Sequence, residues 1–242
     1  MLAVLTSLAS RRTFSLELSS SNTPFSASQY LASQGWDTVS PVVFNLLIPV
    51  GVVCGSLSPL TPALSFSLYP GSTVVLTNYG TISGMGGTSG GGSNSYLYGN
   101  DGLPGGTAVL TTVPLIVWNF GTIQGGGGGG AGSRMRQVFG SDFVVYVPGA
   151  PGGGGAGAAG GSGNGTPNNG YIGNNGFLNI GGLGKYLVSY GYNGYASGQG
   201  GFPGGAGQNA ASGELGGAAG NYINGNALTT WANIGTRWGG AI

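Results

Sequence analysis

Residues 198–216 of the chain read GQGGFPGGAGQNAASGELG, and every third position in this stretch is glycine except one, which is alanine. The in-phase positions are Gly198, Gly201, Gly204, Gly207, Ala210, Gly213 and Gly216. Three residues per turn is the repeat of an extended left-handed helix that makes no hydrogen bonds within itself. The stretch therefore predicts extended three-fold helices, because α-helices and ordinary strands gain nothing from so much glycine.

The same three-residue period recurs through the back of the chain, where glycine supplies 51 of the 159 residues from Gly84 onward but only 5 of the first 83. The shorter in-phase runs are Gly99, Gly102 and Gly105; Gly154, Gly157, Gly160 and Gly163; and Gly170, Gly173 and Gly176. An edge of a three-fold helix without side chains lets a neighbouring backbone approach closely. Ordering each glycine costs roughly 1–2 kcal/mol of backbone entropy, so many hydrogen bonds between segments must offset that cost.

We therefore expect residues 84–242 to form a bundle of short glycine helices folded back by loops. The expected tracts lie near residues 84–92, 99–106, 125–132, 152–165, 170–184 and 198–220, the last of them divided or whole. A β-helix or stacked β-solenoid is the structural alternative. Collagen fits poorly, because it requires an unbroken Gly-X-Y register and abundant proline.

Residues 1–83 have a different character and read as a β-rich domain. Residues 14–18 and 64–68 alternate apolar and polar side chains, which is typical of half-buried strands. The nearly continuous apolar stretch 41–53, broken at Pro49, favours strands buried on both faces. Residues 26–34 suit a helix with Ser26 as N-cap and Gly35 as its stop. Short strands separated by Pro, Gly and Ser turns predict a small β-sandwich or jelly-roll-like fold.

A short repeat marks the crossover between the two regions. Asn78-Tyr79-Gly80-Thr81-Ile82 and Asn119-Phe120-Gly121-Thr122-Ile123 each follow an apolar run and precede a glycine tract, and Asn233-Ile234-Gly235-Thr236 repeats the motif near the end. We expect each copy to end a strand in a tight turn with positive φ at the glycine.

The composition excludes several functions. Histidine is absent and Cys54 is the single cysteine, so an internal disulfide, a Cys/His zinc site and any catalytic set that needs histidine are ruled out. A net charge of +1 gives no electrostatic attraction that would gather nucleic acid or anionic lipid. We therefore expect no cofactor, no metal, no nucleic-acid partner and no membrane insertion. The argument for an enzyme is that folding could bring two acidic residues, such as Asp101 and Asp142, together as the carboxylate pair of a glycosidase.

The aromatic residues between the glycine tracts are the candidate binding residues. Tyr, Ser, Gly and Asn are the composition of adaptable binding loops, and they gather around residues 186–195. The candidates are Tyr96, Tyr98, Phe139, Tyr186, Tyr190, Tyr192, Tyr195 and Phe202. The alternative is that these rings pack against the flanks of the bundle, which we favour for Trp231 and Trp238. Arg134 and Arg136 suit either contact with anionic lipopolysaccharide or a solubilising role.

Aromatic loops that alternate with tracts such as residues 125–130, 152–157 and 198–205 resemble the distal adhesin of T-even-type phage long tail fibres. The Asn-aromatic-Gly-Thr-Ile corners and residues 229–237 are similar to glycine-rich virion proteins of tailed phages. The resemblance covers about residues 70–242. It implies that the glycine tracts form a polyglycine II bundle and that the loops between them recognise the host surface. It also implies that residues 1–83 attach the protein to a fibre or tail tip.

The fold we predict is thus mainly β, with a sandwich-like attachment domain over residues 1–83 and a polyglycine II-like domain with interleaved loops over residues 84–242. The function we predict is that of a non-enzymatic tail fibre or tail-tip adhesin in the virion, binding an outer-surface protein or glycan of a bacterium. A homo-oligomer is an open possibility. The alternatives are a purely structural virion protein, such as a capsid fibre, decoration or tail connector, and a polysaccharide-degrading tail spike.

Overall fold

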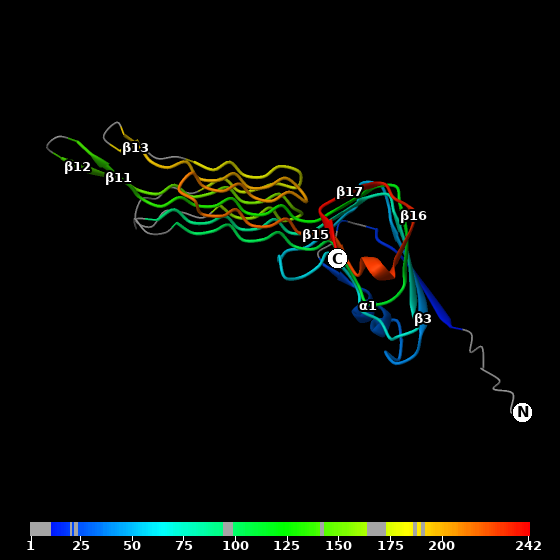
Figure 1. The fold of residues 1–242 in the computed structure, drawn as a ribbon. Helices are drawn as coiled ribbons and strands as arrows, with labels where there is room; N and C mark the ends of the chain where they lie inside the picture. Colours follow the sequence, from blue (N-terminus) through cyan, green and yellow to red (C-terminus); the bar gives the residue numbers. More distant parts are fainter. Residues whose placement is uncertain are drawn as a thin grey trace, which may run out of the picture.

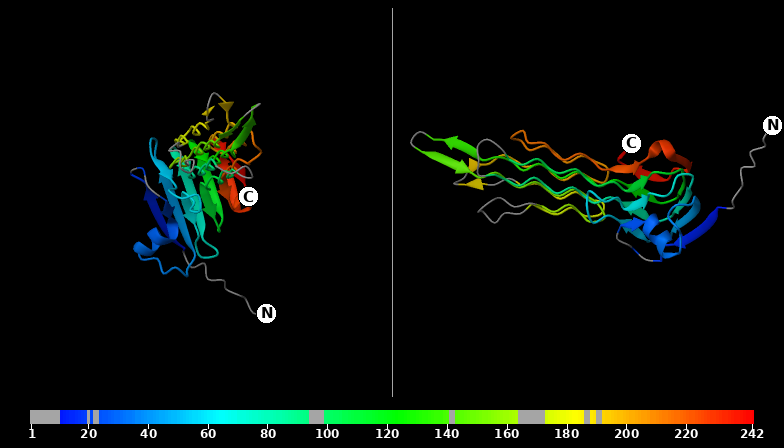
Figure 2. Two further views of the ribbon diagram at one scale, coloured as in Figure 1. Left: turned by 90° about the vertical axis from the view of Figure 1, so that its left-hand side faces the viewer. Right: turned by 90° about the horizontal axis from the view of Figure 1, so that it is seen from below.

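In the computed structural model, the β-strands gather in a body at one end of the molecule and the glycine-rich segments project from it side by side (Figures 1 and 2). The structure describes residues 11–19, 21, 24–93, 99–140, 143–163, 173–185, 188–189 and 192–242. The far end of the projection carries two small hairpins (Figure 1).

Three β-sheets with entirely parallel pairing form the body. Sheet A contains β1 (Arg12–Glu17), β3 (Val42–Ile48), β6 (Thr73–Asn78), β9 (Leu115–Asn119) and β16 (Thr229–Asn233) in that order. Sheet B contains β4 (Val53–Gly55), β7 (Thr81–Ser83), β10 (Thr122–Gln124) and β17 (Thr236–Trp238). Sheet C contains β2 (Phe25–Ser26), β5 (Leu64–Phe66), β8 (Val109–Thr111), β15 (Asn221–Asn224) and β18 (Gly240–Ala241).

The chain runs through sheets A, B and C in turn and forms a three-sided parallel solenoid. Each circuit adds one strand to each side, except that the first passes from β1 in sheet A to β2 in sheet C without a described strand in sheet B. The mainly β class is confirmed, but the sandwich or jelly-roll-like topology is wrong. Those folds pair neighbouring strands in antiparallel fashion. Alternation of apolar and polar residues marks a half-buried strand in either topology, and therefore it does not reveal the direction of the neighbouring strand.

The glycine-rich segments are two long insertions into this solenoid. Residues 84–108 leave after β7 and return at β8, and residues 125–220 leave after β10 and return at β15. Both insertions start at sheet B and end at sheet C, so they project from the edge where those two sheets meet. Each sheet takes strands from both sides of residue 83.

The core of the body lies inside the solenoid. Along β3, side chains alternate between fully buried and half-buried, with Phe44, Leu46 and Ile48 pointing inward. The predicted helix is confirmed as α1 (Ala27–Ser33), which packs against β5 and buries Leu31. Ser26 caps it by accepting a hydrogen bond from the Gln29 N–H, and Gly35 ends it with φ of +79°. The remaining helical turn is η1 (Asn226–Leu228).

The repeated asparagine motif forms the corner between sheets A and B. Asn78 and Asn119 are completely buried, and the Asn78 Nδ2 donates to the Asn119 Oδ1 at 2.8 Å. The Asn119 Nδ2 donates in turn to the Ile234 carbonyl at 2.8 Å, so the ladder links three successive circuits. Positive φ was expected at all three corner glycines, but only Gly235 shows it. Gly80 is needed for a different reason, because a Cβ there would lie 2.3 Å from the Val52 carbonyl oxygen.

Within the projection, residues 125–133 are surrounded by six other segments. Gly126, Gly129 and Gly132 donate to the Gly106, Leu103 and Asn100 carbonyls, while Gly127, Gly130 and Ser133 donate to Ala156, Gly153 and Ala150. Gly128 and Ala131 donate to Gly205 and Gln208. The carbonyls of residues 126–133 accept from Gly220 and Gly217; from Gly87, Gly90 and Ser93; and from Gly201 and Gly198. Each direction of bonding thus recurs every three residues.

Glycine is required because the carbonyl oxygens of neighbouring segments occupy the places of the missing Cβ atoms. A Cβ on Gly99, Gly102 or Gly105 would lie 1.9–2.3 Å from the carbonyl oxygen of Gly132, Gly129 or Gly126. This in-phase run therefore faces residues 125–133, as the three-residue period predicted. Three expected tracts (152–165, 170–184 and 198–220) instead turn back on themselves, since Gly161 bonds to Gly155, Asn174 to Leu183 and Gly207 to Gly217.

We predict that Gly129→Ala destabilises the projection by roughly 3 kcal/mol, because the new methyl group would meet the Thr88 carbonyl oxygen at 2.0 Å and displace a hydrogen-bonded neighbour. Denaturant unfolding followed by amide exchange of residues 84–133 measures the loss. Ala218→Ser, at an exposed position of an adjacent segment, is the matched control. Equal stability of the two variants would contradict the close-contact explanation.

We also predict that Asn119→Ala lowers the free energy of unfolding by about 1–3 kcal/mol, because it removes the 2.8 Å acceptor of the buried Asn78 amide, which keeps only the Thr122 carbonyl at 3.3 Å. Asn233→Ala, in the exposed third copy of the motif, removes a single 3.1 Å bond from the Gly235 N–H and should cost roughly 0.5 kcal/mol. Thermal and denaturant melts of the two variants test the difference, and similar losses would refute the role of the ladder.

Candidate functional site

The far end of the projection is built from two short hairpins set side by side. β11 (Arg136–Phe139) and β12 (Val144–Val147) form the first, and β13 (Val188–Ser189) and β14 (Tyr192–Asn193) form the second. β12 contacts both strands of the second hairpin (Figure 1). The hairpins connect glycine segments that run out from the body. The hydrogen bonds between these segments therefore determine the position of the hairpins.

The first hairpin has one covered and one exposed face. Val138, Val145 and Val147 pack with Ala150 into a small apolar cluster. The register places Gln137 opposite Tyr146 and Phe139 opposite Val144, so these four side chains share the other face. Phe139 is 72% exposed and Tyr146 is 51% exposed. Large apolar side chains this exposed on one strand pair mark a surface suited to binding.

Tyr195 lies beside this hairpin among basic side chains. The guanidinium carbons of Arg134 and Arg136 lie 5.8 and 5.7 Å from the centre of its ring. The Tyr195 carbonyl accepts a hydrogen bond from the Ser133 hydroxyl at 3.0 Å, which holds the loop onto the end of residues 125–133. Cation–π contacts of this kind keep positive charge next to an aromatic surface.

A polar hollow lies next to these arginines, lined by residues 99–101, Arg134 and residues 212–215. The Glu214 carboxylate accepts hydrogen bonds from the Gly99 N–H at 2.9 Å and from the Ser212 hydroxyl. Burial by itself would raise the pKa of this carboxyl, but these hydrogen bonds and the nearby Arg134 outweigh it and hold the pKa below its ordinary value. Glu214 therefore fastens the turn at residues 210–214 to the neighbouring segment.

The structure brings together only part of the predicted set of aromatic residues. Phe139, Tyr195 and the backbone of Tyr192 lie at the far end. Phe202 lies at the other end, next to the body, because the Gly204 N–H donates to the Gly125 carbonyl at the start of the projection. Tyr96, Tyr98, Tyr186 and Tyr190 lie outside the described residues.

Sequence reasoning missed Gln137, Val144 and Tyr146 as members of the exposed face. Residues 143–147 form a continuous apolar and aromatic run, which suits the observed strand β12 but does not show which of its sides is left uncovered. Trp231 packs against the core of the body rather than the flanks of the glycine bundle, with its ring 5.9 Å from that of Tyr222 and 4.6 Å from the Arg237 guanidinium. Trp238 is 45% exposed.

Asp101, one member of the acidic pair considered above, has a structural role here. The Asp101 carboxylate accepts a hydrogen bond from the Leu215 N–H at 2.7 Å, and Asp142 lies outside the described residues. Over the same ranges, no three acidic or cysteine side chains are grouped to hold a metal ion. Among the described residues, no helix has the length and apolar character needed to cross a bilayer.

A family model for the phage tail fibre adhesin Gp38 matches residues 13–242 of the chain. The chain belongs to the Gp38 family of phage tail fibre adhesins. It is also similar to the crystal structure of the gp37–gp38 adhesin tip complex of the bacteriophage S16 long tail fibre. That match has a TM-score of 0.62 and 27% sequence identity, and it covers 96% of this chain and 82% of that chain. No curated protein sequence matches.

The resemblance drawn from the glycine tracts is thereby confirmed, since the family model extends over both the body and the projection. The chain is a phage tail fibre adhesin and a component of the virion. In an adhesin, the part of the molecule that carries function is a binding surface. The exposed face of β11 and β12, together with the Tyr195 loop, is the candidate for that surface.

We predict that the turn at residues 210–214 loosens in acid. Because the folded-state pKa of Glu214 lies below its unfolded value, its contribution to stability is present above the ordinary carboxyl value of about 4.3 and is lost as the pH falls through the folded pKa. Amide protection at Gly99 and in residues 210–215 should fall between about pH 5 and pH 3. Glu214→Gln should lack this dependence, and protection that is constant with pH in the unmodified protein would contradict the assignment.

Proposed function

We propose that the far end of the projection binds a receptor on the bacterial surface, either an outer-surface protein or a glycan, during host attachment. The observation that carries this proposal is the exposed apolar face of β11 and β12, held at the end of hydrogen-bonded glycine segments. Aromatic side chains supply most of the binding energy at many interfaces, provided that they are presented in a fixed position.

The supporting scaffold is the second part of the proposal. We assign the glycine segments to polyglycine II helices, which have three residues per turn and no internal hydrogen bonds. The recurrence of each bonding direction every three residues along 125–133 supports this assignment. Such a bundle would keep the receptor-binding loops at a fixed place and angle, so that little ordering entropy is lost when they bind.

The body would attach the adhesin to the rest of the fibre. The similar crystal structure holds a gp38 together with a gp37 in the tip of a long tail fibre. By that similarity, we propose that the partner of this chain is another tail fibre protein and that its attachment involves the N-terminal region. The adhesin would act by binding alone and without catalysis. A homo-oligomer of this chain is not needed for that role.

We predict that Phe139→Ser, alone or with Tyr146→Ser, weakens binding to host cells at least tenfold, equivalent to about 1.4 kcal/mol, because it removes exposed apolar anchors from the far end. Phe202→Ser is the matched control, since Phe202 is 64% exposed but lies next to the body. Binding of labelled protein to host cells and competition with phage adsorption measure the effect.

The control makes three outcomes distinct. Loss in Phe139→Ser with unchanged binding in Phe202→Ser supports a receptor surface at the far end. Loss in Phe202→Ser alone would move the receptor surface to the base of the projection. Unmodified protein that neither binds host cells nor competes with adsorption would refute receptor binding and favour a purely structural role in the fibre.

A further inference from the structure

We propose that the outer face of sheet A is the surface that docks onto the tail fibre protein. This inference rests on the proposed function, in which the body attaches the adhesin to the fibre, and it assigns that attachment to a particular face. The face is built from the outward side chains of β1, β3, β6, β9 and β16 and from the corners that follow β6, β9 and β16.

The first argument is that the outer side of sheet A carries several large apolar side chains among its uncharged polar ones. β3 was expected to be buried on both faces, but in the isolated chain only its inward residues are fully buried. Its outward residues include Val43 and Leu47, which are only half-buried in the isolated chain. On the neighbouring strands, Val75 of β6 lies opposite Ile116 of β9 and both point outward. Large apolar side chains that are grouped on one exposed face indicate a surface that a partner covers.

The aromatic side chains of the body give the second argument. The rings of Tyr79 and Phe120 stack with their centres 4.9 Å apart, and the exposed Trp118 lies beside them. Together with Val75 and Thr77, these three side chains line a shallow hollow. Trp118 is 44% exposed and Phe120 is 49% exposed. Tryptophan and tyrosine beside a pocket are typical of the anchors of protein interfaces.

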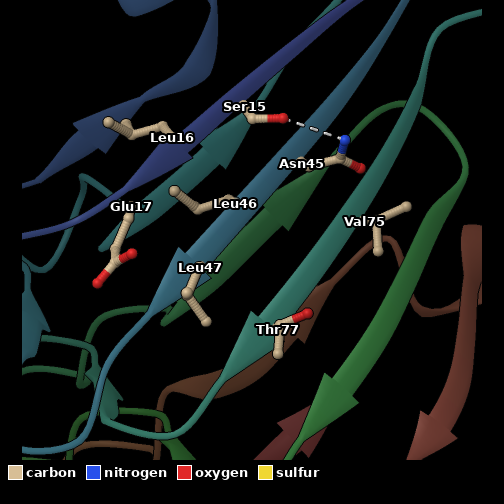
Figure 3. A pocket seen from close by; sticks show the side chains of 8 residues that line it. All are labelled: Ser15, Leu16, Glu17, Asn45, Leu46, Leu47, Val75 and Thr77. Atoms are coloured by element: carbon tan, nitrogen blue, oxygen red, sulfur yellow. Dashed lines mark hydrogen bonds between the residues drawn. The ribbon is translucent and has the colours of Figure 1, made fainter.

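A second hollow on the same face extends the surface toward the first strand, as Figure 3 shows. Leu47, Val75 and Thr77 are among the residues that line it, and the Asn45 Nδ2 donates to the Ser15 hydroxyl at 3.3 Å beside them. Among the outward positions of the five strands, Glu17 on the edge strand β1 carries the one charged side chain. A large neutral surface costs little to desolvate, which suits a permanent apolar interface with a fibre protein.

The third argument is position. Both glycine insertions leave from the edge where sheets B and C meet, and sheet A is the side of the solenoid opposite that edge. In Figure 1, β3 and β16 lie on the side of the body away from the projection, and the hairpins lie at the far end of the projection. A fibre attached to sheet A would therefore point the hairpins away from itself, toward a host surface.

Other exposed apolar side chains do not form a comparable surface. Leu60, Phe177 and Phe202 are exposed on separate loops near the base of the projection, and isolated apolar side chains are ordinary on protein surfaces. The hairpin face of β11 and β12 lies at the opposite end and is occupied by the receptor under the proposed function. Sheet A also draws residues from well beyond residue 83, so attachment would not be confined to the N-terminal region.

The experiment co-expresses the full chain with the long tail fibre protein of the same phage and measures their co-purification and affinity. Trp118→Ser and the double variant Val75→Ser with Trp118→Ser should bind the fibre protein at least tenfold more weakly. Phe177→Ser, which removes another exposed aromatic ring from the base of the projection, should bind like the unmodified chain. All variants should bind host cells as isolated proteins with unchanged affinity, because the hairpins are not altered.

Amide exchange of the unmodified chain, with and without the fibre protein, keeps the test decisive if a variant fails to fold. Protection of residues 42–48, 73–79 and 115–120 on complex formation is the expected result. Protection confined to residues 1–10, to β17 and β18, or to the hairpins would overturn the assignment. A stable dimer of the chain that is lost in Trp118→Ser would likewise overturn it, because a second copy would then cover the face.

The experiment distinguishes a wrong docking face from the absence of any attachment to the fibre protein. Co-purification that is unaffected by the sheet A variants refutes this face alone. The absence of any association between the unmodified chain and the fibre protein refutes the attachment itself, whatever the variants do.

Discussion

The structure depends on backbone hydrogen bonds between segments that have no side chains in the way. Every residue from 126 to 133 donates its N–H to a neighbouring segment, and most of their carbonyls accept a bond from another. One such bond contributes about 1 kcal/mol net, which is comparable to the entropy lost in ordering a glycine. The projection is therefore stable only as a whole, because a single segment leaving the bundle would expose the polar groups of all its neighbours.

The solenoid fixes the position of the glycine segments, which the projection cannot do by itself. Glycine segments have no side chains with which to form an apolar core, so their position must be fixed from outside. The buried side chains of the three sheets and the ladder through Asn78 and Asn119 hold β7, β8, β10 and β15 in register. These strands are the starting and end points of the two insertions, so the spacing between circuits also sets the spacing of the first glycine segments.

Several features were predictable because they follow from local chemistry. The capped helix at Ser26, the strands around Phe14, Phe44 and Phe66, and the close approach of Gly99, Gly102 and Gly105 to a neighbour all follow from periodicity and residue type. Parallel pairing was not predictable in this way, since it depends on how strands far apart in the sequence meet. The repeat of Asn78-Tyr79-Gly80 at Asn119-Phe120-Gly121 was the available signal, because in a solenoid such repeats stack on one another.

The candidate site also depends on how distant parts of the chain are arranged, which the sequence alone did not reveal. Aromatic composition indicated binding loops, but it assigned Phe202 and Phe139 to one set although they lie at opposite ends of the projection. The direction in which each segment runs decides this, and glycine repeats carry no information about direction. Composition also suggested nothing about Val144 and Tyr146, whose exposure depends on which side of the hairpin packs against Ala150.

The close packing of the glycine segments also determines which positions of the chain can accept substitutions. In the interior of the bundle, each missing Cβ is replaced by a carbonyl oxygen at about 2 Å, so almost any substitution there must displace a backbone. The ends of the segments are free of this restriction, because the hairpins and turns lie beyond the last contacts between glycine segments. They bury only small clusters such as Val145, Val147 and Ala150. Substitutions at the far end can therefore be accommodated without loss of the scaffold, and they leave the outer face of sheet A, on the opposite side of the body, unchanged. Under the proposed function, this separation by hydrogen-bonded backbone would let the recognition loops change while the attachment to the fibre is kept.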